Sequence, residues 1–137
     1  MGRRYVKYLL DTHTWIWWHM NPTNLSPTVI DIISDTDSYD EMLLSAISPW
    51  EFCKLLEKNR LGISGHPEEW LHVALQMPKF RLVALSPLIS YRSTCLPQPF
   101  HKDPGDQIIV ATAQTENAII LTRDERLLQY QHVKTGW

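Results

Sequence analysis

The sequence has few of the residues that mark secreted or membrane proteins. It contains only two cysteines in 137 residues, Cys53 and Cys95, which are too few for a disulfide scaffold and lack the spacing of metal ligands. Both are therefore expected to be reduced structural thiols. No apolar run approaches the roughly 20 residues that a membrane span requires. The run after Met1–Arg4 is also too short for a signal peptide, so a cytoplasmic protein is expected.

Neither sign of charge dominates the composition. The 13 Lys and Arg residues and 15 Asp and Glu residues give a formal net charge of −2, which argues against a protein that coats nucleic acid through bulk electrostatics. Local basic groups are still compatible with a nuclease. The length fits one domain over residues 1–137, and the hydrophobic fraction of 44% is enough to bury a core.

Apolar runs alternate with helical patterns along the whole chain. The runs at 5–10, 42–46, 81–85 and from Ala118 predict four strands, and residues 132–137 could supply a short fifth. Several helices are expected to begin at a capping residue followed by proline, at 26–27, 48–49, 86–87 and 103–104. This alternation is typical of an α/β domain with a mostly parallel sheet.

Four acidic residues lie where a strand gives way to a helix or in the first turn of a helix: Asp11, Glu51, Asp106 and Asp124. In open parallel sheets, ligands bind beyond the carboxyl ends of the strands. If these junctions share one edge, the carboxylates converge, raise one another's pKa and resist ionisation unless a cation compensates. The pattern predicts a site for Mg²⁺ or Mn²⁺, hard ions that prefer oxygen ligands.

Each acid also has a simpler explanation. Ser48 and Glu51 have the spacing of a capping box, which taken alone favours a capping role for the glutamate. Asp103 is expected to be the N-cap of the helix that carries Asp106, and Asp124 could cap the short helix that follows it. Asp11 is the hardest to explain in this way, because it directly ends a buried strand. Capping accounts for the acids one by one, but not for their shared placement after strands.

The order and spacing of these motifs resemble those of PIN-domain ribonucleases, most closely the VapC-type toxins of prokaryotic type II toxin–antitoxin systems. The resemblance spans nearly the whole chain and rests on Leu9–Thr14, Ser45–Glu51 with Lys54 and Arg60–Gly62, Leu96-Pro97, His101–Asp106 and Leu121–Asp124. It implies a three-layer α/β/α domain around a parallel sheet of four to five strands in the order 3-2-1-4-5. It also implies a metal-dependent endoribonuclease that uses an activated water and leaves a 5′-phosphate and a 3′-hydroxyl.

By the same resemblance, the metal-binding and catalytic acids fall on Asp11, Glu51, Asp106 and Asp124. Asp103 is a possible helper, and Thr122 matches a hydroxyl position that can hold a metal-bound water. The expected partners are an RNA substrate, a second copy of the chain in a homodimer, and a small antitoxin whose extended segment occupies the groove near the acids.

The chain departs from the family pattern at two positions next to Asp106. Relatives usually carry an aromatic residue where this chain has Gly105, and an arginine where it has Gln107. Neither departure replaces one of the expected metal-binding carboxylates, so the expected metal site is retained. The departures alter the shape and the charge of the lip beside Asp106.

Two lysines are candidates for substrate binding. Lys54 and Lys58 are one turn apart on the helix that carries Glu51, so the three side chains can form a stripe that follows an RNA backbone. A solvated face with an intrahelical Glu–Lys pair explains the same pattern equally well.

The tryptophans and histidines support weaker expectations. Trp15 and Trp18 are one helical turn apart, which favours core packing or subunit contact over stacking of RNA bases, and Trp17 faces elsewhere. His13 and His101 lie two residues from expected acids. A surface or hydrogen-bonding role is favoured for both histidines over contact with a scissile phosphate.

Two other functions are compatible with an aspartate at the end of the first strand. An aspartate-based phosphohydrolase of the haloacid dehalogenase type would need a second aspartate where His13 stands, and a receiver domain would need an acidic pair and a late lysine that the sequence lacks. A catalytically silent PIN fold that acts as a binding module is the remaining alternative, and the intact acids argue against it.

Overall fold

The computed structural model describes residues 4–137. The expectation about the N-terminus falls partly on residues 1–3, which lie outside this range. The elements are β1 (Lys7–Leu10), α1 (Thr12–Met20), α2 (Pro27–Ser34), β2 (Glu41–Ser45), α3 (Ile47–Glu57), α4 (Pro67–Ala74), β3 (Phe80–Val83), α5 (Pro87–Ser93), α6 (Pro104–Glu116), β4 (Ile119–Leu121), α7 (Glu125–Leu128) and β5 (Lys134–Gly136), with short 3₁₀ helices at Pro22–Asn24 and Thr36–Ser38. Over the described range, no helix is long and apolar enough to cross a membrane.

The five strands form one parallel sheet in the order β3-β2-β1-β4-β5, which confirms the expected topology. The central strand β1 pairs with β2 on one side and with β4 on the other, and Leu10 lies opposite both Leu44 and Leu121. The residues that follow Leu10 and Leu121 therefore leave the sheet side by side. All the carboxyl ends meet at one edge, because every pair of strands is parallel.

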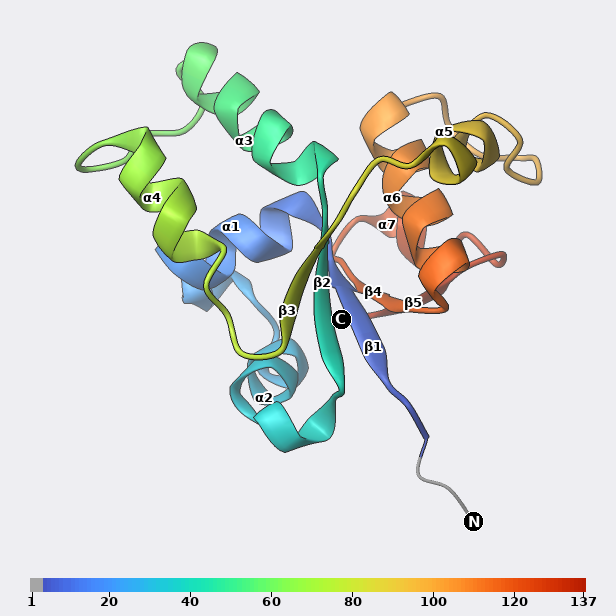
Figure 1. Cartoon of the computed structure of the whole chain (residues 1–137), viewed down its shortest axis with the longest axis horizontal. Helices are drawn as coiled ribbons and strands as arrows, with labels where there is room; N and C mark the ends of the chain where they lie inside the picture. Colours follow the sequence, from blue (N-terminus) through green and yellow to red (C-terminus); the bar gives the residue numbers. More distant parts are fainter. Residues whose placement is uncertain (1–3) are drawn as a thin grey trace.

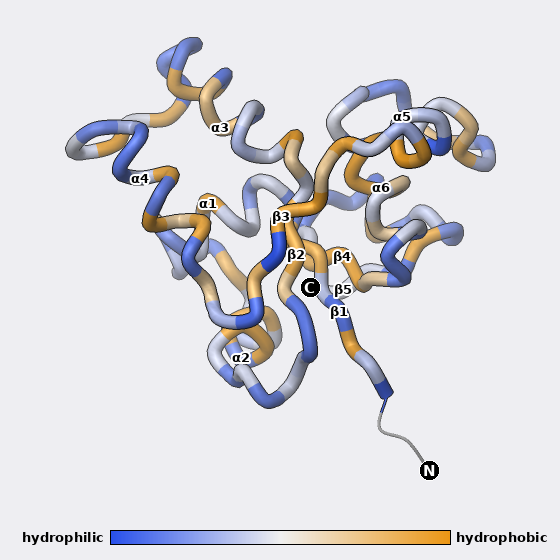
Figure 2. The backbone as a smooth tube through the Cα atoms, in the orientation of Figure 1, coloured by the Kyte–Doolittle hydropathy of each residue, from blue (hydrophilic) through white to orange (hydrophobic). Residues whose placement is uncertain are grey.

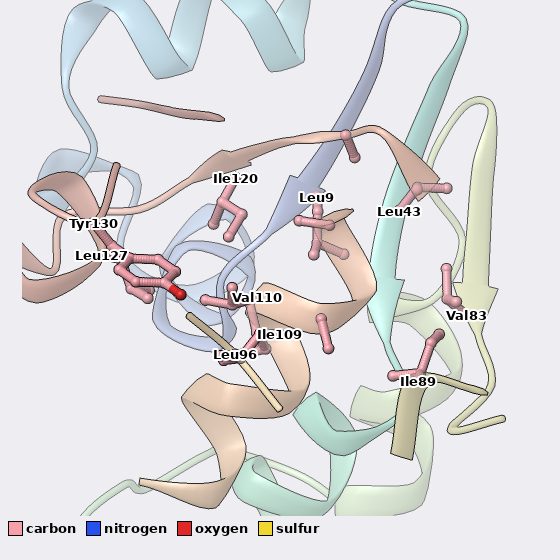
Figure 3. Packing of buried hydrophobic residues seen from close by; sticks show 13 residues of the cluster. Leu9, Leu43, Val83, Ile89, Leu96, Ile109, Val110, Ile120, Leu127 and Tyr130 are labelled. Atoms are coloured by element: carbon pink, nitrogen blue, oxygen red, sulfur yellow. The ribbon is translucent and has the colours of Figure 1, made fainter. Parts of the chain in front are cut away.

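Helices cover both faces of this sheet, so the domain has the expected three layers. Figure 1 shows α1 to α4 on one side and α5, α6 and α7 on the other. Neighbouring strand residues point to opposite faces: Leu9 and Leu43 pack in a core with α5 and α6 (Figure 3), whereas Leu10 and Leu44 belong to the core that α1 and α3 cover. Apolar residues accordingly gather along the central strands (Figure 2).

Local capping signals place most helix starts correctly. Ser26, Ser86 and Asp103 accept hydrogen bonds from the backbone N–H of Val29, Ile89 and Asp106. One strand differs from the expectation: β3 spans Phe80–Val83, whereas the apolar run predicted residues 81–85.

The expected capping box at Ser48 and Glu51 is wrong. Helix α3 begins one residue earlier, at Ile47, and no side chain caps it from the preceding Ala46. The hydroxyl of Ser45, the last residue of β2, instead accepts a hydrogen bond from Ile47 N at 3.2 Å. Ser48 therefore lies inside the helix and is fully buried. The carboxylate of Glu51 is free of a capping role and is available to the pocket described below.

The expectation for the first helix is correct at Trp15. This side chain is fully buried, packs edge-on against Phe52 and Trp70, and donates a hydrogen bond from Nε1 to the Ala74 carbonyl at 3.0 Å. Both cysteines are free thiols, as expected, and both are exposed.

Candidate active site

A pocket of about 510 Å³ lies at the carboxyl edge of the sheet. Its walls come from α1, from α3 and from the residues around the starts of α6 and α7. All four candidate acids line it, together with Asp103. Five basic residues share the same walls: Lys54, Lys58, Arg60, Arg123 and Arg126. The topology thus brings together acids that are up to 113 positions apart in sequence, from Asp11 to Asp124.

Asp11 leaves β1 at the centre of this edge and is only 9% exposed. Its Oδ1 accepts a hydrogen bond from Thr12 N at 2.8 Å, and its Oδ2 accepts one from Thr122 Oγ1 at 2.7 Å. Burial raises the pKa of this carboxyl, and the charge of Asp106 adds to the effect, while the two hydrogen bonds oppose it. The Thr122 hydroxyl also accepts a hydrogen bond from Asp124 N at 3.0 Å, so Thr122 links the two aspartates.

The Glu51 carboxylate is held by a hydrogen bond from Thr12 and does not cap helix α3. Thr12 Oγ1 donates to Glu51 Oε1 at 2.5 Å. Because a hydroxyl has one proton, Ser48 is the donor in the 2.8 Å contact between Ser48 Oγ and Thr12 Oγ1. Burial raises the pKa of Glu51, and the charges of the neighbouring aspartates raise it further, against the hydrogen bond from Thr12. This buried chain of hydroxyls therefore sets the orientation of the carboxylate.

Gly105 determines how closely Glu51 approaches helix α6. The glycine is buried in the first turn of α6. A Cβ atom at this position would overlap Glu51 Oε2 and would lie 3.3 Å from Asp103 Oδ1. The absence of a side chain at Gly105 therefore lets the Glu51 carboxylate rest against the helix start.

Asp106 and Asp124 share a cationic neighbour. Arg126 Nη2 lies 3.1 Å from Asp124 Oδ2 and 3.5 Å from Asp106 Oδ2, and His101 Nε2 lies 2.6 Å from Asp106 Oδ2. Burial raises the pKa of Asp106, together with the charges of Asp103 and Asp124, against the hydrogen bond from His101. At Asp124 burial also acts to raise the pKa, but the hydrogen bonds from Arg126 outweigh it and the pKa is lowered. The guanidinium of Arg126 is a positive charge placed across both aspartates.

Asp103 and Asp124 each cap a helix and also line the pocket. Asp103 Oδ1 accepts from Asp106 N at 3.1 Å, and Asp124 Oδ1 accepts from Arg126 N at 2.9 Å. The capping explanation is therefore right for these two contacts, and it also applies to Asp11, which is the N-cap of α1. Capping uses only Oδ1 of each carboxylate, so it does not exclude a role in the pocket, although Oδ2 of Asp124 already contacts Arg126 Nη2.

The two candidate lysines also line the pocket, on the side of α3. Lys54 Nζ pairs with Glu57 Oε1 at 2.7 Å and lies 5.7 Å from the centre of the Trp50 ring. Lys54 therefore makes an intrahelical Glu–Lys pair, as the solvated-face alternative expects, but its partner is Glu57, because Glu51 is bonded to Thr12. Lys58 is exposed at the end of α3.

These residues fit a divalent cation by their chemistry. Asp11, Glu51 and Asp106 have raised pKa values because they are buried close to other acids. A positive charge placed among them would therefore favour their ionised forms. Arg126 already supplies one cationic group there. Within residues 4–137, no three Asp, Glu, His or Cys side chains are drawn together tightly enough to form a ready metal cage. An ion would therefore compete with the contacts that His101 and Arg126 make to the carboxylates.

Comparison with known proteins gives the family. The PIN domain model matches residues 8–133. Ribonuclease VapC22 of Mycobacterium tuberculosis is 32% identical over 131 residues, covering 94% of this chain and 97% of that protein.

The fold is also found in solved structures. One is VapBC2 from Rickettsia felis bound to a DNA fragment from its promoter, with a TM-score of 0.70 at 13% identity over 96% of this chain and 98% of that one. Another is a toxin–antitoxin complex from Klebsiella pneumoniae, with a TM-score of 0.64 at 21% identity over 95% and 96% of the two chains. Together with the sequence match, these similarities confirm the resemblance that the motifs indicated. The chain belongs to the PIN-domain family and, within it, to the VapC-type ribonucleases.

Proposed function

We propose that this ribonuclease is a metal-dependent endonuclease whose catalytic acids are Asp11, Glu51, Asp106 and Asp124. The observation that carries the proposal is the gathering of these acids in one pocket, where burial raises the pKa of three of them. Such a set is stable in its ionised form when a cation is present. The match over residues 8–133 also supports the expectation that residues 1–137 form a single PIN domain.

In this proposal, the four acids would hold Mg²⁺ or Mn²⁺ at the carboxyl edge of the sheet. When bound, the ion supplies positive charge that promotes attack by water and offsets negative charge at the scissile phosphate. Thr122 orients Asp11 by donating to its Oδ2, and Thr12 orients Glu51 by donating to its Oε1. Fixing these oxygens before substrate arrives reduces the reorganisation that the reaction requires.

An RNA-cleavage assay on the purified protein, without any antitoxin, tests this proposal. We expect cleavage of RNA to products with a 5′-phosphate, loss of cleavage when EDTA removes divalent ions, and recovery on addition of excess Mg²⁺ or Mn²⁺. Cleavage that persists at full rate in EDTA would contradict a metal-dependent mechanism. An absence of cleavage under all of these conditions would favour the silent binding module instead.

We also propose that a small antitoxin inhibits this chain and that the chain forms a homodimer. The similar structure from Klebsiella pneumoniae, which is described as a toxin–antitoxin complex, supports the first part. Exposed apolar side chains on the edge strand β3 and on α5 support the second part, because subunit interfaces bury residues of this kind. They are Leu82, Leu88 and Tyr91, which are 43%, 48% and 68% exposed.

The substrate role of the lysines gives a salt-dependence prediction. If Lys54 and Lys58 contact RNA phosphates, replacing both by alanine weakens RNA binding and flattens its dependence on salt, by about 0.7 in log–log slope for each lost contact to a single strand. The measurement is RNA affinity across a salt series in EDTA, so that the RNA stays intact.

The matched control is the double variant Arg92→Ala and Lys134→Ala, which also removes two positive charges but at positions outside the pocket. Both residues are exposed and neither lines the pocket. If the salt dependence of RNA affinity had the same slope in this control and in the double lysine variant, Lys54 and Lys58 would be residues of an ordinary solvated helix face.

A further inference from the structure

Trp50 is unusual among the six tryptophans of this chain. Its side chain is 59% exposed, whereas Trp15 is buried and the other four are partly buried. Tryptophan offers the largest apolar surface of any side chain, and leaving it in water is unfavourable. The side chain nevertheless lies on the rim of the acidic pocket, one residue before Glu51 in α3.

A cation accompanies this exposed ring. Lys54 is one turn further along α3, and its Nζ lies 5.7 Å from the centre of the Trp50 ring. Lys54 and Lys58 line the same pocket, as does Arg60 beyond the end of the helix. The wall that carries Trp50 therefore holds three basic side chains, one of which, Lys54, also pairs with Glu57, in contrast to the carboxylates grouped at the sheet edge.

Helix α1 repeats this combination of an aromatic ring and a cation. Trp17 lines the pocket, and Arg123 Cζ lies 5.9 Å from its ring centre. An adjoining cavity of about 330 Å³ shares His13, Trp17, Leu55 and Arg60 with the main pocket, so the walls continue past the acids between α1 and α3. The Trp17 ring is already flanked by His13 and Trp137. Trp50 is therefore the ring with open surface.

We propose that Trp50, with Lys54 beside it, is a stacking site for an unpaired nucleobase of the RNA, next to the phosphate that the acids address. Grooves that bind single-stranded nucleic acid combine cations along the backbone with aromatic rings on which bases stack. The charge of this wall complements a polyanion, and the exposed ring complements the flat face of any base. A base inside a duplex has no free face, so the site requires an unpaired nucleotide.

This inference rests on the proposed ribonuclease function, but its readout is binding, so the two can fail separately. The experiment uses the full chain without antitoxin, in EDTA, with three probes: a short single-stranded RNA, the same sequence in a duplex, and an abasic chain of equal length. Trp50→Leu removes the aromatic face, and Trp50→Phe keeps part of it. Tyr5→Leu is the matched control, because Tyr5 is 64% exposed, has Lys7 Nζ 5.7 Å from its ring centre and does not line the pocket.

We expect Trp50→Leu to weaken binding of the single strand about tenfold or more, and Trp50→Phe to weaken it less. Binding of the duplex and of the abasic chain should be the same in wild type and in Trp50→Leu, and thermal stability should be unchanged because the side chain is exposed. Equal affinity of wild type and Trp50→Leu for the single strand would overturn the proposal, as would an equal loss for the abasic chain. Weakened binding of an antitoxin with unchanged RNA binding would assign Trp50 to a protein contact and would also overturn it.

Discussion

Asparagine in place of Asp11 is expected to lower RNA cleavage by about a hundredfold or more, because it removes one of the charges that the proposed ion requires. The metal-free protein should keep or gain stability. Burial raises the pKa of Asp11, so at neutral pH the folded state holds a charge that it disfavours, and asparagine relieves this cost. The measurements are the cleavage rate and the melting temperature with and without Mg²⁺.

The pH dependence of stability gives a second readout for the same variant. Because the folded-state pKa lies above the unfolded value, the native protein binds the proton first, and stability falls as pH rises through this range. Wild type should therefore gain stability relative to Asp11→Asn as pH falls from neutral through the raised pKa. Mg²⁺ should raise the melting temperature of wild type much more than that of the variant.

Asp31→Asn is the matched control, because Asp31 is exposed on α2 and does not line the pocket. It should retain wild-type cleavage and the full Mg²⁺ response. If Mg²⁺ raised the melting temperatures of wild type and Asp11→Asn equally, the ion would not be bound through Asp11.

The positions of the acids could be predicted because they depend on strand ends, which leave a local signal. An apolar run that stops at Asp11 identifies both a buried strand and its carboxyl end. Parallel pairing of β1 with β4 then places Asp11 near Asp124. The order of the strands required the family resemblance, since periodicity alone does not specify which strands are neighbours.

The partners of those acids could not be predicted, because they depend on contacts between distant segments. The pattern at Ser48 and Glu51 indicated a capping box, but the backbone N–H of Ile47 bonds to Ser45, and Thr12 donates to the Glu51 carboxylate. With Glu51 engaged, Lys54 pairs with Glu57 instead. The sequence between Asp124 and Arg126 likewise gives no sign that one guanidinium would span two aspartates. The spacing of residues in the sequence identifies which residues lie at the carboxyl edge of the sheet. The orientation of each side chain depends on which hydrogen-bond donors reach it in the folded chain.

Alanine in place of Gly105 is expected to weaken Mg²⁺ binding and cleavage by about 10- to 100-fold, the usual effect of disturbing the groups that orient metal ligands. The new Cβ would overlap Glu51 Oε2, so the carboxylate must move away from α6 and strain its hydrogen bond to Thr12. The fold should survive, because the displaced atoms are the end of a flexible side chain. Helix propensity favours alanine over glycine by up to about 1 kcal/mol, so stability should be kept or raised.

Two further variants separate this effect from a general glycine effect. Gly62→Ala is the control, because a Cβ there would meet no atom within 4 Å. Glu51→Asp combined with Gly105→Ala shortens the acid and makes room for the methyl group, so the two changes should be less than additive in a double-mutant cycle on Mg²⁺ affinity. Strict additivity, or an unchanged Mg²⁺ affinity in Gly105→Ala, would mean that the approach of Glu51 to α6 has no part in metal binding.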